Sequence, residues 1–194
     1  MAKKPPYKNR KYVTHSGVMV RNGTTYVINT KKSGIYSTIL HRTIDQLDIC
    51  LSKWKRVLLI RFDLHQPFYS AKNKHISRFR KNLFRRLERE YQIAEVGYIW
   101  VREQERSKNQ HYHWAIYLDG NKIRHSSKVL RIIKETWLGI NADNHIPTIK
   151  NPYYFIDNEQ TKLEAIYRIS YLAKARGKGY RDRQAKDYST SRLI

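Results

Sequence analysis

The chain has 194 residues and carries 39 Lys and Arg side chains against 16 Asp and Glu, which gives a formal charge of +23. A charge of this size opposes a compact fold unless a polyanion offsets it, so nucleic acid is the first class of partner to consider. The single cysteine, Cys50, excludes an internal disulfide framework and a cysteine-based zinc finger within one chain.

The two ends of the chain differ from its middle. Residues 1–15 are basic and lack hydrophobic periodicity, which predicts a flexible arm that contacts phosphates. Residues 16–178 are predicted to form a single domain, and residues 179–194 a flexible tail. No apolar run has the length of a membrane span and no signal peptide is recognisable, so we expect a cytoplasmic protein without a membrane partner.

Two elements are predicted in the first quarter of the chain. The β-rich runs 18–20 and 25–28 flank Asn22-Gly23, and this dipeptide is the strongest short-range signal for a β-hairpin. Apolar residues at helical spacing predict a helix from about Thr43 to Trp54, with Thr43 as a candidate N-cap.

A strand is predicted over residues 56–65 and is ended by Pro67. Its first half is apolar on both faces, which indicates a position inside a sheet. In its second half Arg61, Asp63 and His65 share one face, because alternate residues of a strand point the same way. We interpret this polar face as a DNA-binding candidate, and the alternative is a strand end that faces water.

A long amphipathic helix is predicted over residues 71–91. Its apolar stripe consists of Ile76, Phe79, Leu83, Leu87 and Tyr91. Its outer face is rich in arginine and lysine, which favours contacts with phosphates, although a solvated surface would also explain it.

Two further strands, 96–102 and 111–118, are predicted to form a hairpin through the polar residues 106–110. His111 and His113 project from one face of the second strand, and a turn centred near Ser107 places Glu103 opposite His111. Two imidazoles and a carboxylate then form a metal site with open coordination positions. If the turn shifts by one residue, Asp63 or His65 becomes the third ligand, and a purely structural role of the His-x-His pair is the other alternative.

The last third of the chain is predicted to contain two helices. Residues 126–138 form the first and end near Gly139, and a loop over 140–158 contains one short strand at 153–156. The second helix runs from about Glu159 to Ala175 and presents Tyr167, Tyr171 and Lys174 on one face. The whole pattern predicts an α+β fold, with a central antiparallel sheet and helices packed on it.

These residues together suggest one reaction. A metal ion held by Glu103, His111 and His113 can polarise a DNA phosphodiester, and a tyrosine hydroxyl can then attack the phosphorus in line. The product is a phosphotyrosine linkage and a free 3′-hydroxyl. Because Lys174 follows Tyr171 by three residues, we predict Tyr171 as the nucleophile, with Lys174 assisting it and Tyr167 as a second candidate. Ligand chemistry alone also leaves zinc open.

The sequence resembles the HUH endonucleases. Within this group it most resembles the YagK/YfjJ-type and inovirus-type phage replication proteins. The resemblance covers residues 54–178 and rests on three motifs. They are Arg61-Phe62-Asp63-Leu64-His65, Trp100-Val101-Arg102-Glu103-Gln104 with His111-Tyr112-His113, and Tyr171-Leu172-Ala173-Lys174. It implies a ferredoxin-like core, a Mg²⁺ or Mn²⁺ cofactor, and site-specific nicking of single-stranded or supercoiled origin DNA. It also implies initiation of rolling-circle replication of a phage or mobile element in a bacterial host.

Two other functions are compatible with the same residues. One is a basic DNA-binding regulator on the same fold that performs no chemistry, and the other is an HUH transposase or relaxase. No Walker-type ATPase motif is recognisable, so a replication initiator of this kind would need a host helicase as a partner.

Overall fold

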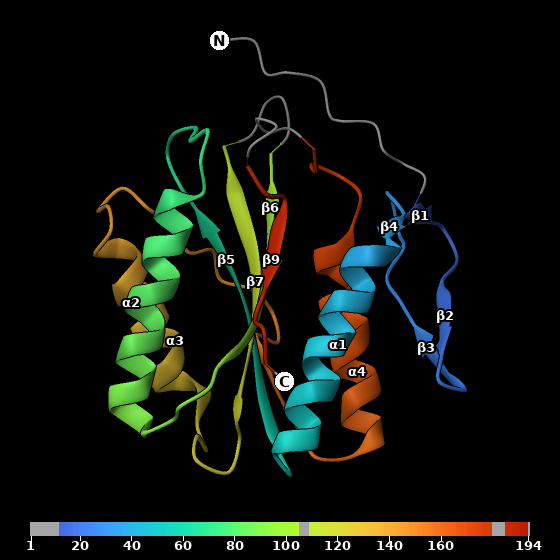
Figure 1. Ribbon diagram of the computed structural model, residues 1–194. Helices are drawn as coiled ribbons and strands as arrows, with labels where there is room; N and C mark the ends of the chain where they lie inside the picture. Colours follow the sequence, from blue (N-terminus) through green and yellow to red (C-terminus); the bar gives the residue numbers. More distant parts are fainter. Residues whose placement is uncertain (1–11, 105–108, 180–184, 194) are drawn as a thin grey trace.

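The computed structural model describes residues 12–104, 109–179 and 185–193 (Figure 1). In chain order the elements are β1 (Val13–Thr14), β2 (Val18–Arg21), β3 (Thr24–Val27), β4 (Ile35–Tyr36), α1 (Ser37–Lys53), β5 (Val57–His65), α2 (Lys74–Tyr91), β6 (Gly97–Glu103), β7 (His111–Asp119), α3 (Ser126–Leu138), β8 (Tyr153–Ile156), α4 (Glu159–Ile169), the 3₁₀ turn η2 (Ser170–Ala173) and β9 (Tyr188–Thr190). No helix among these residues is both long and apolar enough to cross a lipid bilayer.

The centre of the molecule is a five-stranded sheet in the order β8-β5-β7-β6-β9. Every neighbouring pair is antiparallel, so the predicted α+β fold with a central antiparallel sheet is confirmed. The register places Glu103 opposite His111 and Asp63 opposite His113. The predicted pairing of Glu103 with His111 is therefore confirmed and the one-residue shift does not occur, while the turn near Ser107 lies outside the described residues.

Helices cover both faces of this sheet, with α1 and α4 on one side and α2 and α3 on the other (Figure 1). The strands alternate accordingly. On β5, Val57 and Leu59 pack in the core beneath α1 and α4, whereas Leu58 and Ile60 pack in the core beneath α2 and α3. The sheet can be buried on both faces because its interior strands are apolar on both.

Two further two-stranded sheets are formed by the residues that precede α1 in the sequence. β2 and β3 form the predicted hairpin, and their turn residues Asn22 and Gly23 have φ values of 49° and 77°. Positive φ at both central positions is what a two-residue hairpin turn requires, and Asn-Gly is the sequence best suited to it. β1 pairs with β4 in a separate short ladder.

Two helix boundaries differ from the sequence predictions. The first helix begins at Ser37 rather than Thr43, and Thr43 donates its hydroxyl hydrogen to the Ile39 carbonyl from inside the helix instead of capping it. The last helix ends at Ile169 and tightens into the 3₁₀ turn Ser170–Ala173 instead of continuing to Ala175. Tertiary packing of Leu172 and Ala173 into the core beneath α1 accompanies this tightening.

The flexible tail predicted for residues 179–194 is wrong for residues 188–190. These residues form β9, which pairs with β6 at the edge of the central sheet. No strand signal is recognisable in this segment because the strand is only three residues long. Within the predicted flexible arm, residues 13 and 14 form β1, whereas residues 1–11 lie outside the described part of the chain.

Candidate metal centre

A cluster of polar side chains lies where β5, β6 and β7 continue past the apolar core beneath α1 and α4. This polar group consists of Asp63, Glu103, His111 and His113. On each of these strands the residues that face α1 and α4 change from apolar to polar. On β6, Ile99 and Val101 belong to the core, and the next residue on the same face is Glu103. On β7, Ala115 and Tyr117 belong to the core, and His113 and His111 extend the same face. The sheet register then brings these polar ends together.

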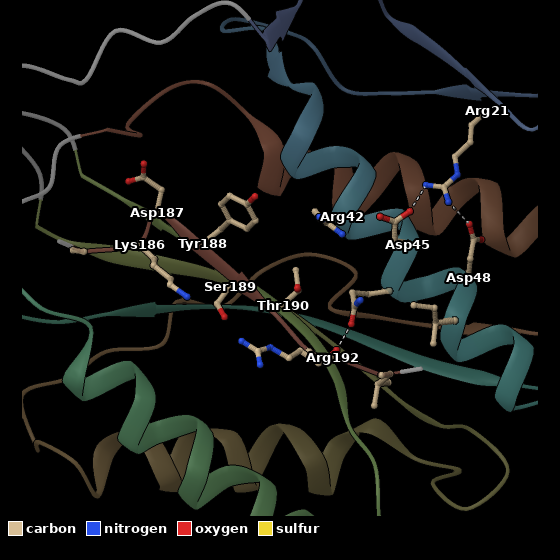
Figure 2. A pocket seen from close by; sticks show the side chains of 15 residues that line it. Arg21, Arg42, Asp45, Asp48, Lys186, Asp187, Tyr188, Ser189, Thr190 and Arg192 are labelled. Carbon is tan, nitrogen blue, oxygen red and sulfur yellow. Dashed lines mark hydrogen bonds and ion pairs between the residues drawn. The ribbon is translucent and has the colours of Figure 1, made fainter. Parts of the chain in front are cut away.

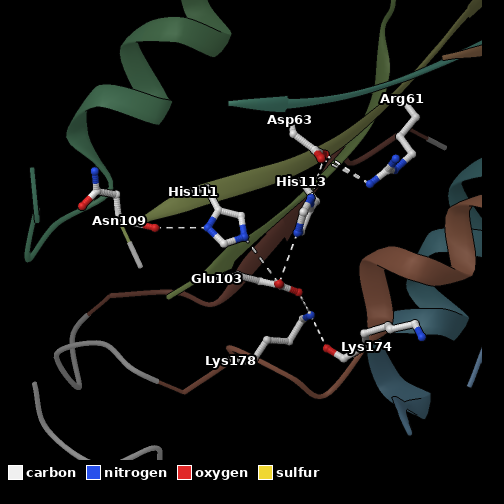
Figure 3. Close-up of polar contacts among 8 residues, drawn as sticks. All are labelled: Arg61, Asp63, Glu103, Asn109, His111, His113, Lys174 and Lys178. Carbon is white, nitrogen blue, oxygen red and sulfur yellow. Dashed lines mark hydrogen bonds and ion pairs between the residues drawn. The ribbon is translucent and has the colours of Figure 1, made fainter. Parts of the chain in front are cut away.

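Among the residues that the structure describes, Glu103, His111 and His113 form a group that could hold a metal ion (Figure 3). Their ligand atoms all lie within 4.8 Å of one another. Glu103 Oε2 is 3.2 Å from His113 Nε2 and 3.6 Å from His111 Nε2. Glu103 and His113 are buried, and His111 is partly exposed. A divalent ion would therefore have protein ligands on one side and an approach for substrate on the other.

The outer nitrogens of both imidazoles have acceptors. His113 Nδ1 is 2.7 Å from Asp63 Oδ1, and His111 Nδ1 is 3.2 Å from the Asn109 carbonyl oxygen. An acceptor at Nδ1 holds a proton on that nitrogen, so Nε2 is the nitrogen that would bind a metal ion, which is how metal-binding histidines are usually oriented. His113 Nε2 is buried, and although Glu103 Oε2 lies 3.2 Å from it, this nitrogen makes no well-aligned hydrogen bond with the described residues. These residues fit a metal ion.

The carboxylates of this group are ionised. Burial acts to raise the pKa of Glu103, but the charges of Lys178 and His113 outweigh it and hold that pKa well below its usual value. Burial likewise opposes ionisation of Asp63, but the hydrogen bond and charge of His113 lower the pKa of Asp63 below its usual value. Ionised carboxylates are the form that binds cations, so the group needs no deprotonation of Glu103 at neutral pH.

Tyr171 lies beside the candidate metal ligand His113. Its ring meets the His113 ring edge to face at a centroid distance of 5.2 Å. The Arg61 guanidinium carbon lies 4.7 Å from the centre of the Tyr171 ring. Burial and the charge of Glu103 raise the pKa of Tyr171, and the Arg61 charge opposes this rise. Arg61 is thus a cation that favours the phenolate, and it comes from a strand rather than from the tyrosine segment.

The other two residues of the predicted tyrosine face, Lys174 and Tyr167, differ in their surroundings. The Lys174 ammonium donates to the Lys31 carbonyl and lies 5.8 Å from the centre of the Tyr171 ring. Tyr167 is 39% exposed. The continuous α-helix that the sequence predicted over these three residues does not form, because the backbone tightens into a 3₁₀ turn after Ile169. The catalytic roles of Lys174 and Tyr167 stay predictions.

Arg61, Asp63 and His65 do share the predicted face of β5. Arg61 and Asp63 are buried and paired with each other at 3.3 Å, so they support Tyr171 and His113 from within. The His65 ring is 5.0 Å from that of His111, and burial together with the His111 charge lowers the pKa of His65 to about 4. Direct contact of these three residues with DNA stays a prediction.

Sequence reasoning missed Lys178 and Asn109. Lys178 lies in a glycine-containing stretch without periodicity, and its partner Glu103 is 75 positions away. No local pattern connects the two. Asn109 contributes a backbone carbonyl, and backbone acceptors carry no sequence signal.

A cavity near α1 is lined by residues other than Glu103, His111 and His113 (Figure 2). It has a volume of about 930 Å³ and is bounded by α1, Arg21 and the segment that contains β9. Arg21 bridges two acidic residues of α1, at 2.7 Å from Asp45 and 3.3 Å from Asp48. This cavity is therefore separate from the candidate metal ligands.

Comparison with known proteins gives one match. The family model named YagK/YfjJ C-terminal domain matches residues 19–187. The chain belongs to this family. The YagK/YfjJ match contains the candidate metal ligands together with Asp63, Tyr171 and Lys178, so the whole polar group lies within the family domain. No curated protein and no solved structure gives a significant match.

Proposed function

We propose that this YagK/YfjJ-family protein is a metal-dependent tyrosine endonuclease and strand transferase of the HUH type, acting on single-stranded DNA. The observation that supports it most is the 5.2 Å contact between the Tyr171 ring and the His113 ring. A candidate nucleophile and a candidate metal ligand then share one site, as in-line attack on a phosphodiester needs. The biological role that we infer is the initiation of rolling-circle replication, with a host helicase as partner.

Glu103, His111 and His113 would hold a Mg²⁺ or Mn²⁺ ion, which supplies charge to polarise the scissile phosphate. Tyr171 loses its hydroxyl proton, and its oxygen forms a bond to phosphorus. The bond from phosphorus to the 3′ oxygen breaks, and that oxygen takes up a proton to become a 3′-hydroxyl. One phosphodiester is exchanged for another, so the same residues can carry out the reverse reaction and rejoin strands.

Asp63 orients the candidate metal ligand His113, and Arg61 places a positive charge beside the candidate nucleophile Tyr171. Asp63 accepts from His113 Nδ1 at 2.7 Å, and it also contacts the Arg61 guanidinium, which lies against the Tyr171 ring. A cation over an aromatic face stabilises negative charge as the phenol ionises. One carboxylate thus orients a metal ligand and the cation beside the nucleophile.

Duplex DNA has a separate candidate surface on α2. Five exposed cations repeat along the side of this helix that is opposite its buried stripe, and they are Lys74, Arg78, Lys81, Arg85 and Arg89. None of them has an acidic partner among the described residues, although the exposed Glu88 lies beside the last turn. At 1.5 Å per residue the row is ~22 Å long, which matches the rise of about six base pairs.

The test uses single strands from the DNA that flanks the encoding gene, each carrying a fluorophore at its 3′ end. With Mn²⁺, we expect wild type to acquire the fluorophore covalently, because the tyrosine becomes bonded to the 5′ phosphate of the labelled fragment. Tyr171→Phe should acquire none. Tyr167→Phe is the matched variant four residues earlier, and it tests whether a second tyrosine takes part. A Tyr171→Phe protein that is labelled as well as wild type would refute Tyr171 as the nucleophile.

The second candidate function is that of a non-catalytic DNA-binding regulator. The row of cations on α2 favours it, because this row could bind DNA without any contribution from the candidate metal ligands. In that case Tyr171→Phe and His113→Ala would bind DNA as wild type does, and no adduct would form with any strand. The adduct assay therefore separates the two functions.

A further inference from the structure

Lys178 is a buried lysine that contacts the metal group from the side away from the histidines (Figure 3). It is 4% exposed, and its ammonium lies 2.5 Å from Glu103 Oε1. The other oxygen of the same carboxylate, Oε2, faces the two imidazoles. Glu103 therefore divides its oxygens between a cation of the protein and the position that a metal ion would take.

A buried carboxylate is costly unless a cation compensates it. His113 and Lys178 are the positively charged groups that act most strongly on Glu103. The Lys174 side chain points away from Glu103 in Figure 3 and bonds to the Lys31 carbonyl. With no metal ion bound, Lys178 is thus the cation with the shortest contact to Glu103 among the described residues.

The segment that carries Lys178 is fitted closely to the end of β6. The Gly177 carbonyl accepts a hydrogen bond of 2.7 Å from the Gln104 amide. Gly177 has a φ of +73°, and a Cβ at this position would lie 3.3 Å from Glu103 Cβ. A side chain at position 177 would therefore be strained and crowded against the metal ligand.

Lys178 also reaches the tyrosine segment. Its ammonium donates a second hydrogen bond, to the Lys174 carbonyl, directly after the turn that contains Tyr171. The Lys178 side chain thus links Glu103 on β6 to the segment that follows the candidate nucleophile Tyr171.

We propose that Lys178 is a tethered counter-ion: it holds Glu103 in its ligand position, neutralises it when no divalent ion is bound, and limits the affinity for that ion. This inference rests on the proposed metal site and deepens it. Lys178 is a positioning residue, since it acts through Glu103 and through the tyrosine segment. The physical basis is competition, because the ammonium and a divalent cation share one carboxylate.

The experiment compares Lys178→Met with wild type, using Mn²⁺ as the probe, electron paramagnetic resonance for its Kd and thermal unfolding for stability. Without metal we expect a lower Tm for Lys178→Met. Mn²⁺ should raise the Tm of the variant by more than it raises that of wild type, and the variant should bind Mn²⁺ at least about tenfold more tightly. Lys178→Arg should restore values near those of wild type.

The matched control is Lys53→Met, which removes an exposed lysine paired with Glu95 at 2.9 Å. It should leave the response to Mn²⁺ unchanged. If Lys178→Met does not fold, the double variant Glu103→Gln with Lys178→Met supplies the test, because removal of both charges should restore folding without metal.

Two outcomes separate this inference from the metal site. Equal Mn²⁺ affinity and equal Tm shifts in wild type and Lys178→Met would overturn the counter-ion role and leave the metal site intact. Absence of Mn²⁺ binding by wild type, Lys178→Met and Lys178→Arg would overturn the metal site and the counter-ion role together. A double variant that stays unfolded would also contradict the proposed charge pairing.

Discussion

The two faces of the central sheet differ at one end only. On the face beneath α2 and α3, apolar side chains continue to the end of β5 with Phe62 and Leu64, and Trp114 of β7 packs among them. On the opposite face the corresponding residues, Asp63 and His113, are polar. The same strands thus supply core on one side and the candidate site on the other. Replacing apolar by polar residues on one face of the strands is therefore sufficient to form a candidate site, while the residues on the other face stay buried in the core.

The largest effect is expected at His113, on the polar side of β7. His113→Ala removes a metal ligand, the partner of Asp63 and the ring that packs against Tyr171. We expect adduct formation to fall at least about ten-thousandfold, because both the metal and the nucleophile lose their support. The adduct assay measures this loss, and circular dichroism checks the fold. Adduct formation near the wild-type rate would show that His113 is not a ligand.

The next residue, Trp114, should show the opposite behaviour. It is fully buried and stacks on Phe62 at a centroid distance of 5.7 Å. Trp114→Ala should lower the free energy of unfolding by about 3–5 kcal/mol through lost burial and the cavity that remains. Urea titration measures the change, and Tyr153→Ala, at a residue that is 44% exposed, is the control. If Trp114→Ala instead spares stability and weakens Mn²⁺ binding, the two faces are not separate in function.

A smaller effect is expected from Asp63→Asn. The amide keeps the shape of the side chain but removes the charge that orients His113 and balances Arg61. Loss of such a supporting group typically weakens metal binding by about 10–100-fold. The Mn²⁺ Kd measures it, and Asp157→Asn, at an exposed residue paired with Arg56, should have no effect. An unchanged Kd in Asp63→Asn would remove Asp63 from the site.

The smallest effect is expected on α2, outside both faces. Arg85→Ala should reduce the slope of log K for duplex binding against log salt by about 0.9, the value for one phosphate contact. The Mn²⁺ Kd should not change, because α2 lies across the sheet from the metal ligands. Lys128→Ala, which disrupts an ion pair with Glu90, is a control of equal charge. A uniform slope across all variants would exclude α2 as the duplex surface.

Much of the site could be predicted because it lies on strands. The two-residue period assigns Asp63, His111 and His113 to faces, and the length of the hairpin loop places Glu103 opposite His111. Both assignments are local, so the sequence contains the information needed. The helix that starts at Ser37 was placed six residues too late, because its first turn has no side-chain cap to mark it.

The sequence by itself determined the strand faces, the hairpin register and the residues able to bind a metal ion, because each depends on spacing within one short segment. Only the tertiary structure decided that the tyrosine segment tightens after Ile169, that β9 closes the edge of the sheet, and that Lys178 lies against Glu103. These features depend on contacts between segments far apart in the chain. Local periodicity cannot predict such contacts, because they contribute to the free energy of folding only when the packed core brings the distant segments together.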